Sequence, residues 1–250
     1  MTKTMFITGA TAGIGEACAR RFTNEGWQVV GTGRRRDRLD KLALELGDAF
    51  HSLELDMRDA GAFQATLDSL PPSHRGIDLL LNNAGLAPPM SPLQDAGQEP
   101  IDTVIDTNID GLVALTRLLL PTLIERKGAI INLSSVAATY PYRGGAVYAG
   151  TKAFVRQFSL GLRCDLAGTG VRVTSIEPGM VETEFTIVRT GGDKAASDAL
   201  YANMEPMSAD DIASTIWWVA DLPSHVNINA LELMPTSQSW AGFAVHRSEG

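Results

Sequence analysis

Tyr148 and Lys152 lie four positions apart in the stretch "YAGTK", where the chain passes from a loop into an amphipathic helical pattern. Residues i and i+4 share one face of a helix, so the Lys152 ammonium can lie close to the Tyr148 phenol. A free phenol has a pKa of about 10, and a nearby cation stabilises its phenolate. The pair could therefore donate and accept a proton. Two solvated residues on a helix face would show the same spacing.

A glycine-rich stretch, "TGATAGIG" at residues 8–15, directly follows the first apolar run of the chain. Gly9, Gly13 and Gly15 permit a tight turn, close approach of a pyrophosphate to backbone N–H groups, and close packing of a helix on a strand. Such a pattern between a strand and a helix is typical of dinucleotide-binding proteins. A turn with a purely structural role is the alternative.

The second apolar run ends at Gly33, and Arg34 and Arg35 follow it. A carboxylate at this point would bond the ribose 2′-hydroxyl of NAD and repel the 2′-phosphate of NADP. Glycine leaves room there, and a guanidinium offers two parallel hydrogen bonds to a phosphate. Because cations are unfavourable at a helix N-terminus, two in succession indicate an external anion. The pattern favours NADP(H), while Arg36 and Arg38 are consistent with a solvated helix start.

Short apolar and β-branched runs alternate with longer helical patterns along the whole chain. Seven such runs with helical connections predict a Rossmann-type, doubly wound parallel sheet with helices on both faces, in one α/β domain spanning residues 1–250. Ligands bind at the carboxyl ends of the strands in this architecture. Two irregular segments, 85–100 and 183–206, should project there, and we expect the second to form a substrate lid. Residues 236–250 form a C-terminal tail.

The composition excludes several classes of partner. A formal net charge of −8 and a pI of about 5.0 argue against nucleic acid and anionic membranes, both of which attract basic surfaces. No uninterrupted apolar run approaches the roughly 18 residues that a membrane-spanning helix needs. The N-terminus also lacks the apolar region of a signal peptide. We therefore expect a cytoplasmic protein with no membrane partner.

Only two cysteines occur, Cys18 and Cys164, each inside a predicted helix. Neither has the spacing of a metal ligand, and the four histidines form no cluster with them, so no metal site is expected. Free cysteines are among the residues most often buried. We therefore expect two buried free thiols.

Further motifs follow in order along the chain: "NNAG" at 82–85, Asn108, "SS" at 134–135, and "PGMVET" at 178–183. Together with "TGATAGIG" and "YAGTK", their order and spacing resemble the short-chain dehydrogenase/reductase family over essentially the whole chain. Within it, "YAGTKAFVRQFSL", "VNINALELMP" and "AVHR" are similar to a bacterial NADP-dependent branch. This branch includes dehydrogenases of 3-hydroxy acids such as serine and L-allo-threonine, malonic semialdehyde reductases and sulfoacetaldehyde reductases.

The resemblance implies a catalytic set made of Asn108, Ser135, Tyr148 and Lys152. Tyr148 is expected to protonate the carbonyl oxygen during reduction and to act as the base in the reverse direction. Lys152 lowers the pKa of that phenol and bonds the ribose of the nicotinamide nucleoside. Ser135 holds the substrate oxygen, whereas Ser134 is expected to be structural. Asn108 holds a water that links Lys152 to solvent.

The resemblance also implies the contacts to an NADP(H) cofactor. Asp56 is expected to bond the adenine amino group, and Asn82 to be the turn residue that stabilises the sheet edge under the cofactor. Pro178 and Gly179 form a wall of the nicotinamide site, with Thr183 on its carboxamide. The complete set of expected cofactor contacts is Thr8, Gly9, Thr11, Gly13, Ile14, Gly15, Arg34, Arg35, Asp56, Met57, Asn82, Ala84, Gly85, Tyr148, Lys152, Pro178, Gly179, Val181 and Thr183.

Arginines near this site indicate a small anionic carbonyl substrate. Arg143 precedes the tyrosine, Arg189 lies in the lid and Arg247 lies in the tail, while Ser135 and Tyr148 would hold the reacting oxygen. A guanidinium suits a carboxylate or a sulfonate equally, so both remain open. The expected reactions are sulfoacetaldehyde to isethionate, or interconversions of malonic semialdehyde or of 3-hydroxy acids such as 3-hydroxypropionate, serine and allo-threonine. A general small-carbonyl reductase and a non-catalytic NADP(H)-sensing protein are the alternatives.

Related proteins pair helices into tetramers, and the matching elements here are long and apolar. The predicted helices at about 100–125 and 147–167 carry apolar residues on more than one face. The last strand, "NALELMP", would otherwise leave an exposed sheet edge. We therefore expect a homotetramer.

Overall fold

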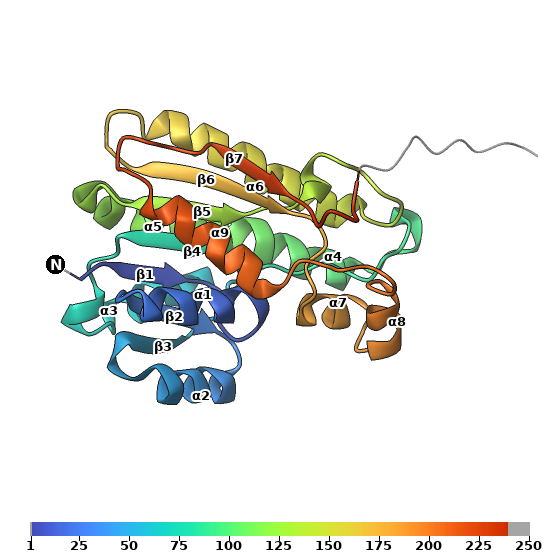
Figure 1. The fold of residues 1–250 in the computed structure, drawn as a ribbon, viewed down its shortest axis with the longest axis horizontal. Coiled ribbons are helices and arrows are strands. Elements are labelled where there is room, and N and C mark those ends of the chain that lie inside the picture. Colours follow the sequence, from blue (N-terminus) through green and yellow to red (C-terminus); the bar gives the residue numbers. More distant parts are fainter. Residues whose placement is uncertain (1, 240–250) are drawn as a thin grey trace, which may run out of the picture.

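A seven-stranded parallel sheet with helices on both faces forms the centre of the molecule (Figure 1). The computed structural model describes residues 2–239. The strand order is β3-β2-β1-β4-β5-β6-β7, and every pairing is parallel. The predicted fold class is therefore confirmed. The strands are β1 (Thr4–Ile7), β2 (Gln28–Gly33), β3 (Phe50–Glu54), β4 (Leu79–Asn82), β5 (Ala129–Leu133), β6 (Arg172–Pro178) and β7 (Ala230–Leu233).

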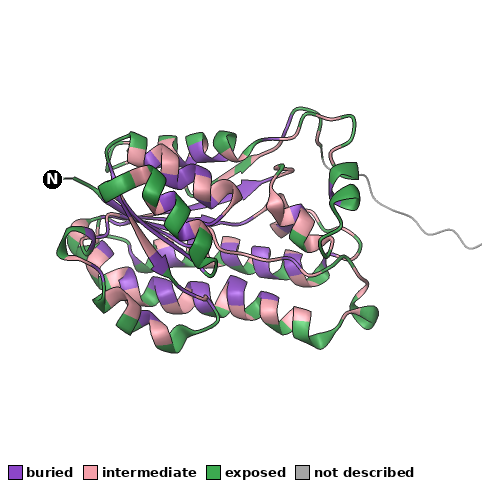
Figure 2. Ribbon diagram, turned by 90° about the horizontal axis from the view of Figure 1, so that it is seen from below, coloured by how far each residue is buried: buried purple, intermediate pink, exposed green. Residues whose placement is uncertain are grey.

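The inner strands of the sheet carry apolar residues on both faces, because helices cover each face. In β1, Met5 and Ile7 belong to one hydrophobic core, whereas Phe6 between them belongs to the other. Figure 2 shows buried residues along the strands and along the inward faces of the helices. The first core includes residues of α1 (Gly13–Asn24), α2 (Arg36–Leu46) and α9 (Ala209–Asp221); the second includes residues of α3 (Phe63–Asp68), α5 (Gly111–Arg126) and α6 (Ala146–Asp165).

A continuous helix runs from Gln98 to Arg126 and comprises α4 (Gln98–Ile105), a π-helical turn (Asp106–Asp110) and α5. With a mean hydropathy of 1.2 over 18 residues, it is the one helix in residues 2–239 that could cross a membrane by length and composition alone. We expected no such helix, because no uninterrupted apolar run is long enough to span a membrane. The mean hydropathy of a window can still be high when single polar residues interrupt the run. Leu115 and Leu119 of this helix pack in the second core, so its apolar character contributes to covering the sheet.

The predicted lid projects from the carboxyl end of β6 and contains two short helices, α7 (Glu184–Arg189) and α8 (Lys194–Ala199) (Figure 1). Its two ends are joined at the base. Val181 pairs with Met207 in an isolated parallel bridge, and the Glu182 N–H donates to the Met207 carbonyl at 2.9 Å. The segment 183–206 is therefore a closed loop on a fixed base.

The two cysteines differ in environment. Cys18 in α1 is buried, and burial raises the pKa of its thiol far above its usual value. Cys164 is exposed, so our expectation of two buried thiols was wrong for this residue. The buried positions of α6 near its end are Val155, Ser159 and Leu162, and Cys164 does not lie on this helical stripe.

Candidate active site

The glycine-rich loop between β1 and α1 has the conformation that its glycines predict. Gly9 and Gly13 have positive φ angles of 73° and 55°. A Cβ on Gly15 would lie 2.1 Å from the Gly9 carbonyl oxygen, so only glycine permits this approach of helix and loop. Thr8 is buried, and its hydroxyl accepts hydrogen bonds from the N–H groups of Asn83 and Ala84. Thr8 and Gly15 therefore shape the loop and do not line the cleft.

Asn82 and Asn83 have separate roles at the end of β4. The Asn82 amide donates to Thr116 Oγ1 at 2.9 Å and to Asn132 Oδ1 at 2.8 Å, inside the fold. The Asn83 amide donates to the carbonyls of Thr8 and Gly9 at 2.8 and 3.1 Å and lines the cleft. Asn82 thus bonds the neighbouring strand of the sheet, and its expected role in stabilising the sheet edge under the cofactor stays a prediction. Asn83, which the sequence did not single out within "NNAG", bonds the glycine-rich loop.

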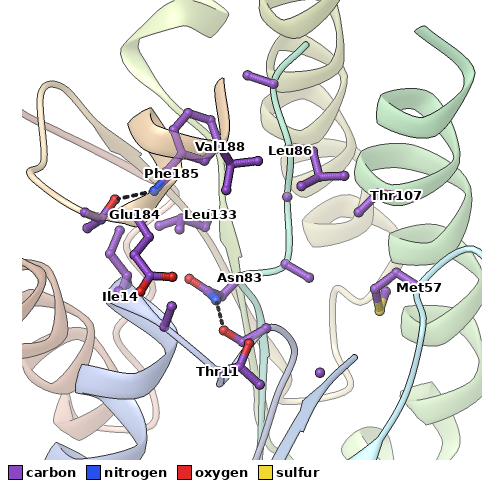
Figure 3. Close-up of a pocket in the computed structure, with 18 of the residues that line it drawn as sticks. Thr11, Ile14, Met57, Asn83, Leu86, Thr107, Leu133, Glu184, Phe185 and Val188 are labelled. Atoms are coloured by element: carbon purple, nitrogen blue, oxygen red, sulfur yellow. Dashed lines mark hydrogen bonds between the residues drawn. The ribbon is translucent and has the colours of Figure 1, made fainter. Parts of the chain in front are cut away.

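A cleft of about 360 Å³ opens at the carboxyl ends of the strands, beneath the lid (Figure 3). Most of the predicted cofactor contacts line it: Gly9, Thr11, Gly13, Ile14, Arg34, Arg35, Asp56, Met57, Ala84, Gly85, Tyr148, Lys152, Pro178, Gly179, Val181 and Thr183. Ser135 also lines it. The sequence did not single out several further lining residues, which include Asn83, Leu86, Thr107, Leu133, Glu184, Phe185 and Val188.

Tyr148 and Lys152 lie on one face of α6, as the spacing predicts, and both are buried. The Lys152 amine lies 5.8 Å from the centroid of the Tyr148 ring and donates to the Leu133 carbonyl at the end of β5 at 2.7 Å. Burial raises the pKa of Tyr148 to about 12 and lowers the pKa of Lys152 to about 8. Both shifts disfavour the charged form of the buried group.

Two neighbours oppose the effect of burial on Tyr148. A hydrogen bond from Ser135 and the positive charge of Arg189 each lower the pKa of the phenol. Ser135 Oγ also accepts a hydrogen bond from the Ala137 N–H at 3.1 Å, which orients the hydroxyl. Ser134 is buried and donates to the Lys152 carbonyl at 2.7 Å, in keeping with the structural role expected of it.

Asn108 lies in the π-helical turn, a type of helix irregularity that is frequent at functional sites. Its amide donates to the Leu86 carbonyl at 2.9 Å and to Thr151 Oγ1 at 3.0 Å, and its carbonyl accepts from the Leu86 N–H. A Cβ on Gly85 would lie 3.3 Å from Lys152 Nζ and 3.4 Å from Asn108 Oδ1. The absence of a side chain at Gly85 thus leaves space between the amine and the amide, although Asn108 itself does not line the cleft.

The end of β2 has no room for a carboxylate, because a Cβ on Gly33 would lie 2.6 Å from Thr11 Cγ2. Arg35 donates from Nε and Nη2 to Thr11 Oγ1 at 3.1 and 2.8 Å. Arg36 forms an exposed pair with Asp40, as a solvated helix start would. Arg38 was also expected to be solvated, but it forms an ion pair with the carboxylate of Glu184, as Arg35 does.

Asp56 lies at the same edge of the cleft, where it is ion-paired with Arg58 at 2.7 Å. Hydrogen bonds from Arg58 hold the pKa of the Asp56 carboxyl below its usual value. The group is therefore an acceptor at neutral pH, as a contact to an amino group requires.

Of the three candidate substrate arginines, the structure places one beside the tyrosine. Arg189 donates from Nη2 to the Tyr142 hydroxyl at 2.9 Å, and its guanidinium lies 5.8 Å from the centroid of the Tyr148 ring. Its Nε is buried without a hydrogen-bond partner among the described residues, and Arg189 is not one of the residues that line the cleft. Arg143 is exposed and does not line the cleft. Arg247 lies outside the described residues.

Within residues 2–239, no group of three or more His, Cys, Asp or Glu side chains is placed to hold a metal ion.

Comparison with known proteins agrees with the fold and the cleft. Residues 3–192 match the family model for short chain dehydrogenase. Serine 3-dehydrogenase of Agrobacterium fabrum is 61% identical over 247 residues, with 99% of each chain covered. Sulfoacetaldehyde reductase 2 of Chromohalobacter salexigens is 54% identical over 251 residues, which cover 99% of this chain and 100% of that relative.

Among solved structures, the closed form of serine dehydrogenase complexed with NADP+ has a TM-score of 0.96 and 51% sequence identity. The match covers 98% of this chain and 100% of that chain. The relatives and the solved structure match nearly the full length of the chain, and the family model matches residues 3–192. The chain belongs to the short-chain dehydrogenase family and is an oxidoreductase.

Proposed function

We propose that this protein is an NADP(H)-dependent oxidoreductase that interconverts a small anionic aldehyde or ketone with the matching hydroxy compound. One observation carries the proposal: a buried Tyr148 lies beside Lys152 and Ser135, with the Arg189 guanidinium over its ring. The relatives include a serine 3-dehydrogenase and a sulfoacetaldehyde reductase, whose names both denote small charged substrates. The proposed compartment is the cytoplasm.

The residues of the cleft fit NADP(H). The glycine-rich loop leaves backbone N–H groups open to a pyrophosphate at the start of α1. Gly33 excludes the carboxylate that would repel a 2′-phosphate, and Arg34 and Arg35 line the same end of the cleft. When bound, the cofactor supplies the hydride that reduces the carbonyl carbon.

The side chains supply the proton and the orientation. Ser135 donates a hydrogen bond to the carbonyl oxygen, and the Tyr148 hydroxyl donates the proton that completes the alcohol. Because the pKa of Tyr148 is raised to about 12, the phenol is protonated at neutral pH and ready to act as the acid. In the reverse direction the phenolate is the base, and the charges of Lys152 and Arg189 stabilise it. Asn108 and the space at Gly85 provide the proposed route by which a water returns the proton.

Arg189 is the proposed anion clamp. A short substrate has few groups to bind, and a charge-assisted hydrogen bond is an effective way to hold its carbonyl against Ser135 and Tyr148. The N–H donors of Arg189 that do not bond Tyr142 are the proposed partners of a carboxylate or a sulfonate. Figure 3 shows Phe185 and Val188 of the lid across the cleft from Leu86, so apolar side chains surround the reacting carbons.

The cofactor proposal predicts the effect of removing Arg35. Arg35→Ser should raise the KM for NADPH by about 10- to 100-fold, the range for losing a charge-assisted contact of about 1.5–3 kcal/mol. The KM for NADH should change much less, because NADH has no 2′-phosphate and Arg38 still bonds Glu184 when Arg35 is removed. Steady-state kinetics with both cofactors measure this. Arg36→Ser is the matched control, since Arg36 pairs with Asp40 outside the cleft; equal wild-type efficiencies with NADPH and NADH would contradict the proposal.

The substrate proposal is tested by assaying sulfoacetaldehyde, malonic semialdehyde, L-serine and a neutral aldehyde of similar size side by side. Arg189→Ala should raise the KM of the preferred anion by about 10- to 100-fold. If Arg189→Ala lowers kcat equally for the anion and for the neutral aldehyde, that loss reports the influence of Arg189 on Tyr148 and not on anion binding. Arg143→Ala is the control, because that residue is exposed. If the neutral aldehyde is reduced as efficiently as the anions, the protein is a general small-carbonyl reductase.

We also propose a homotetramer. Ile105, Ile124 and Phe154 are exposed large apolar side chains on the long helices, and Phe154 stacks on Phe158 with ring centroids 5.8 Å apart. Strand β7 is the edge of the sheet. Helix α9, which precedes β7 in the chain, carries the exposed Trp218. Light scattering of the full chain at micromolar concentration should give four copies, and a species of only 26.7 kDa would exclude the assembly.

A further inference from the structure

Glu184, the first residue of α7, connects the lid to the opposite side of the cleft. Its carboxylate accepts from Arg35 Nη1 at 3.0 Å and from Arg38 Nη1 at 2.7 Å. These arginines belong to the start of α2, 149 and 146 positions earlier in the chain. Figure 3 shows the Glu184 side chain directed from the lid into the cleft. We refer to Glu184, Arg35 and Arg38 as the clasp.

The clasp lies above the glycine-rich loop. A Cβ on Gly13 would lie 3.2 Å from Thr183 Cβ, so the residue before Glu184 contacts the loop where a pyrophosphate would bind. With the base of the lid held by Val181 and Met207, opening the cleft at this point requires Thr183 and Glu184 to leave their partners. Thr183 and Glu184 line the same cleft as the glycine-rich loop, so a dinucleotide bound there would lie beneath them.

Hydrogen bonds join the two halves of the lid to each other and to its base. The Tyr201 hydroxyl donates to the Val181 carbonyl at 2.9 Å and shares a hydrogen bond of 2.5 Å with Thr186 Oγ1. Two sets of contacts then hold the lid to the rest of the fold: those of Arg189 with Tyr142 on the substrate side, and those of Glu184 with Arg35 and Arg38 on the cofactor side.

The clasp is strong enough to hold the lid and weak enough to open during turnover. The side chains of Arg35, Arg38 and Glu184 are 42%, 39% and 44% exposed. Ion pairs with this exposure contribute little free energy and are screened by salt. The two arginines lower the pKa of the Glu184 carboxyl, so it is charged at neutral pH.

A 2′-phosphate does not have to displace Glu184. The hydrogen bonds of Arg35 to Thr11 and Glu184 engage one N–H each on Nε, Nη1 and Nη2. A guanidinium has five N–H donors, so donors remain on Arg35 within the described contacts. Arg34 also lines this end of the cleft. The clasp can therefore remain closed while the phosphate binds beside it.

Building on the proposed NADP(H) function, we propose that Glu184 is a positioning residue whose clasp with Arg35 and Arg38 holds the lid over the bound cofactor and sets the rate of cofactor release. The clasp acts on the lid and not on the 2′-phosphate. It should therefore slow the release of NADPH and of NADH by the same factor.

The test is stopped-flow displacement of NADPH, and separately of NADH, from full-length wild-type protein, from Glu184→Gln and from Glu182→Gln. Glu182 is exposed at the base of the lid, so its variant makes the same charge change on the same segment outside the clasp. We expect Glu184→Gln to speed the release of both cofactors by about two- to fivefold, the scale of an exposed ion pair. Glu182→Gln should match the wild type. Raising the salt concentration should speed NADH release from the wild type more than from Glu184→Gln.

Three results would overturn the proposal. Unchanged release of both cofactors would mean that the contact does not hold the lid. Faster release of NADPH alone would mean that Glu184 only orients the phosphate-binding arginines, and slower release of NADPH alone would mean that it competes with the phosphate. Wild-type protein that binds neither cofactor would instead contradict the proposed function, so the two failures are distinguishable. If Glu184→Gln does not fold, the rate of NADH release from the wild type is measured at rising salt concentration instead. A release rate that does not increase with salt would overturn the proposal.

Discussion

The burial of the Lys152 amine beside the Tyr148 phenol is the constraint around which the cleft is built. A charged amine is costly to bury unless it is hydrogen-bonded, and here the Leu133 carbonyl at the end of β5 accepts from it. The same strand end leads to Ser134, which bonds the backbone of Lys152, and to Ser135, which bonds Tyr148. One strand end and the first turns of one helix thus hold the three groups in a fixed relation. The space that Gly85 leaves beside the amine completes this arrangement.

The electrostatics of the cleft follow from the same burial. Burial alone raises the pKa of Tyr148 and lowers that of Lys152, so both groups are pushed toward their neutral forms. Arg189 opposes this at Tyr148 because its guanidinium lies over the ring. The lid that carries Arg189 also carries Glu184, so the proposed contacts to the substrate and to the cofactor lie on one segment.

The sequence predicts those parts of the molecule that depend on local pattern. Alternating runs predict the parallel sheet, and the glycine loop, "YAGTK" and Gly33 with its arginines predict the residues that line the cleft. Contacts between distant segments were missed. Nothing near Glu184 or Arg38 indicates that they meet, because 146 positions separate them. Asn83 was not singled out, because the pattern does not show that its amide bonds the loop after β1. Arg143 and Arg189 have equal charge in the sequence, and only the fold shows that one faces solvent and the other faces Tyr148.

Replacing the Tyr148 hydroxyl alone tests the central claim most directly. In Tyr148→Phe, reduction of whichever anion the wild type prefers should fall by about 10²- to 10⁴-fold in kcat, the usual contribution of a positioned general acid. The dissociation constant for NADPH, measured by fluorescence titration, should stay within about twofold of the wild type, because the ring and Lys152 keep their packing. Near-normal turnover in Tyr148→Phe would contradict the assignment of this phenol as the acid. Wild-type protein that binds NADPH but turns over no substrate would point to a sensing role instead.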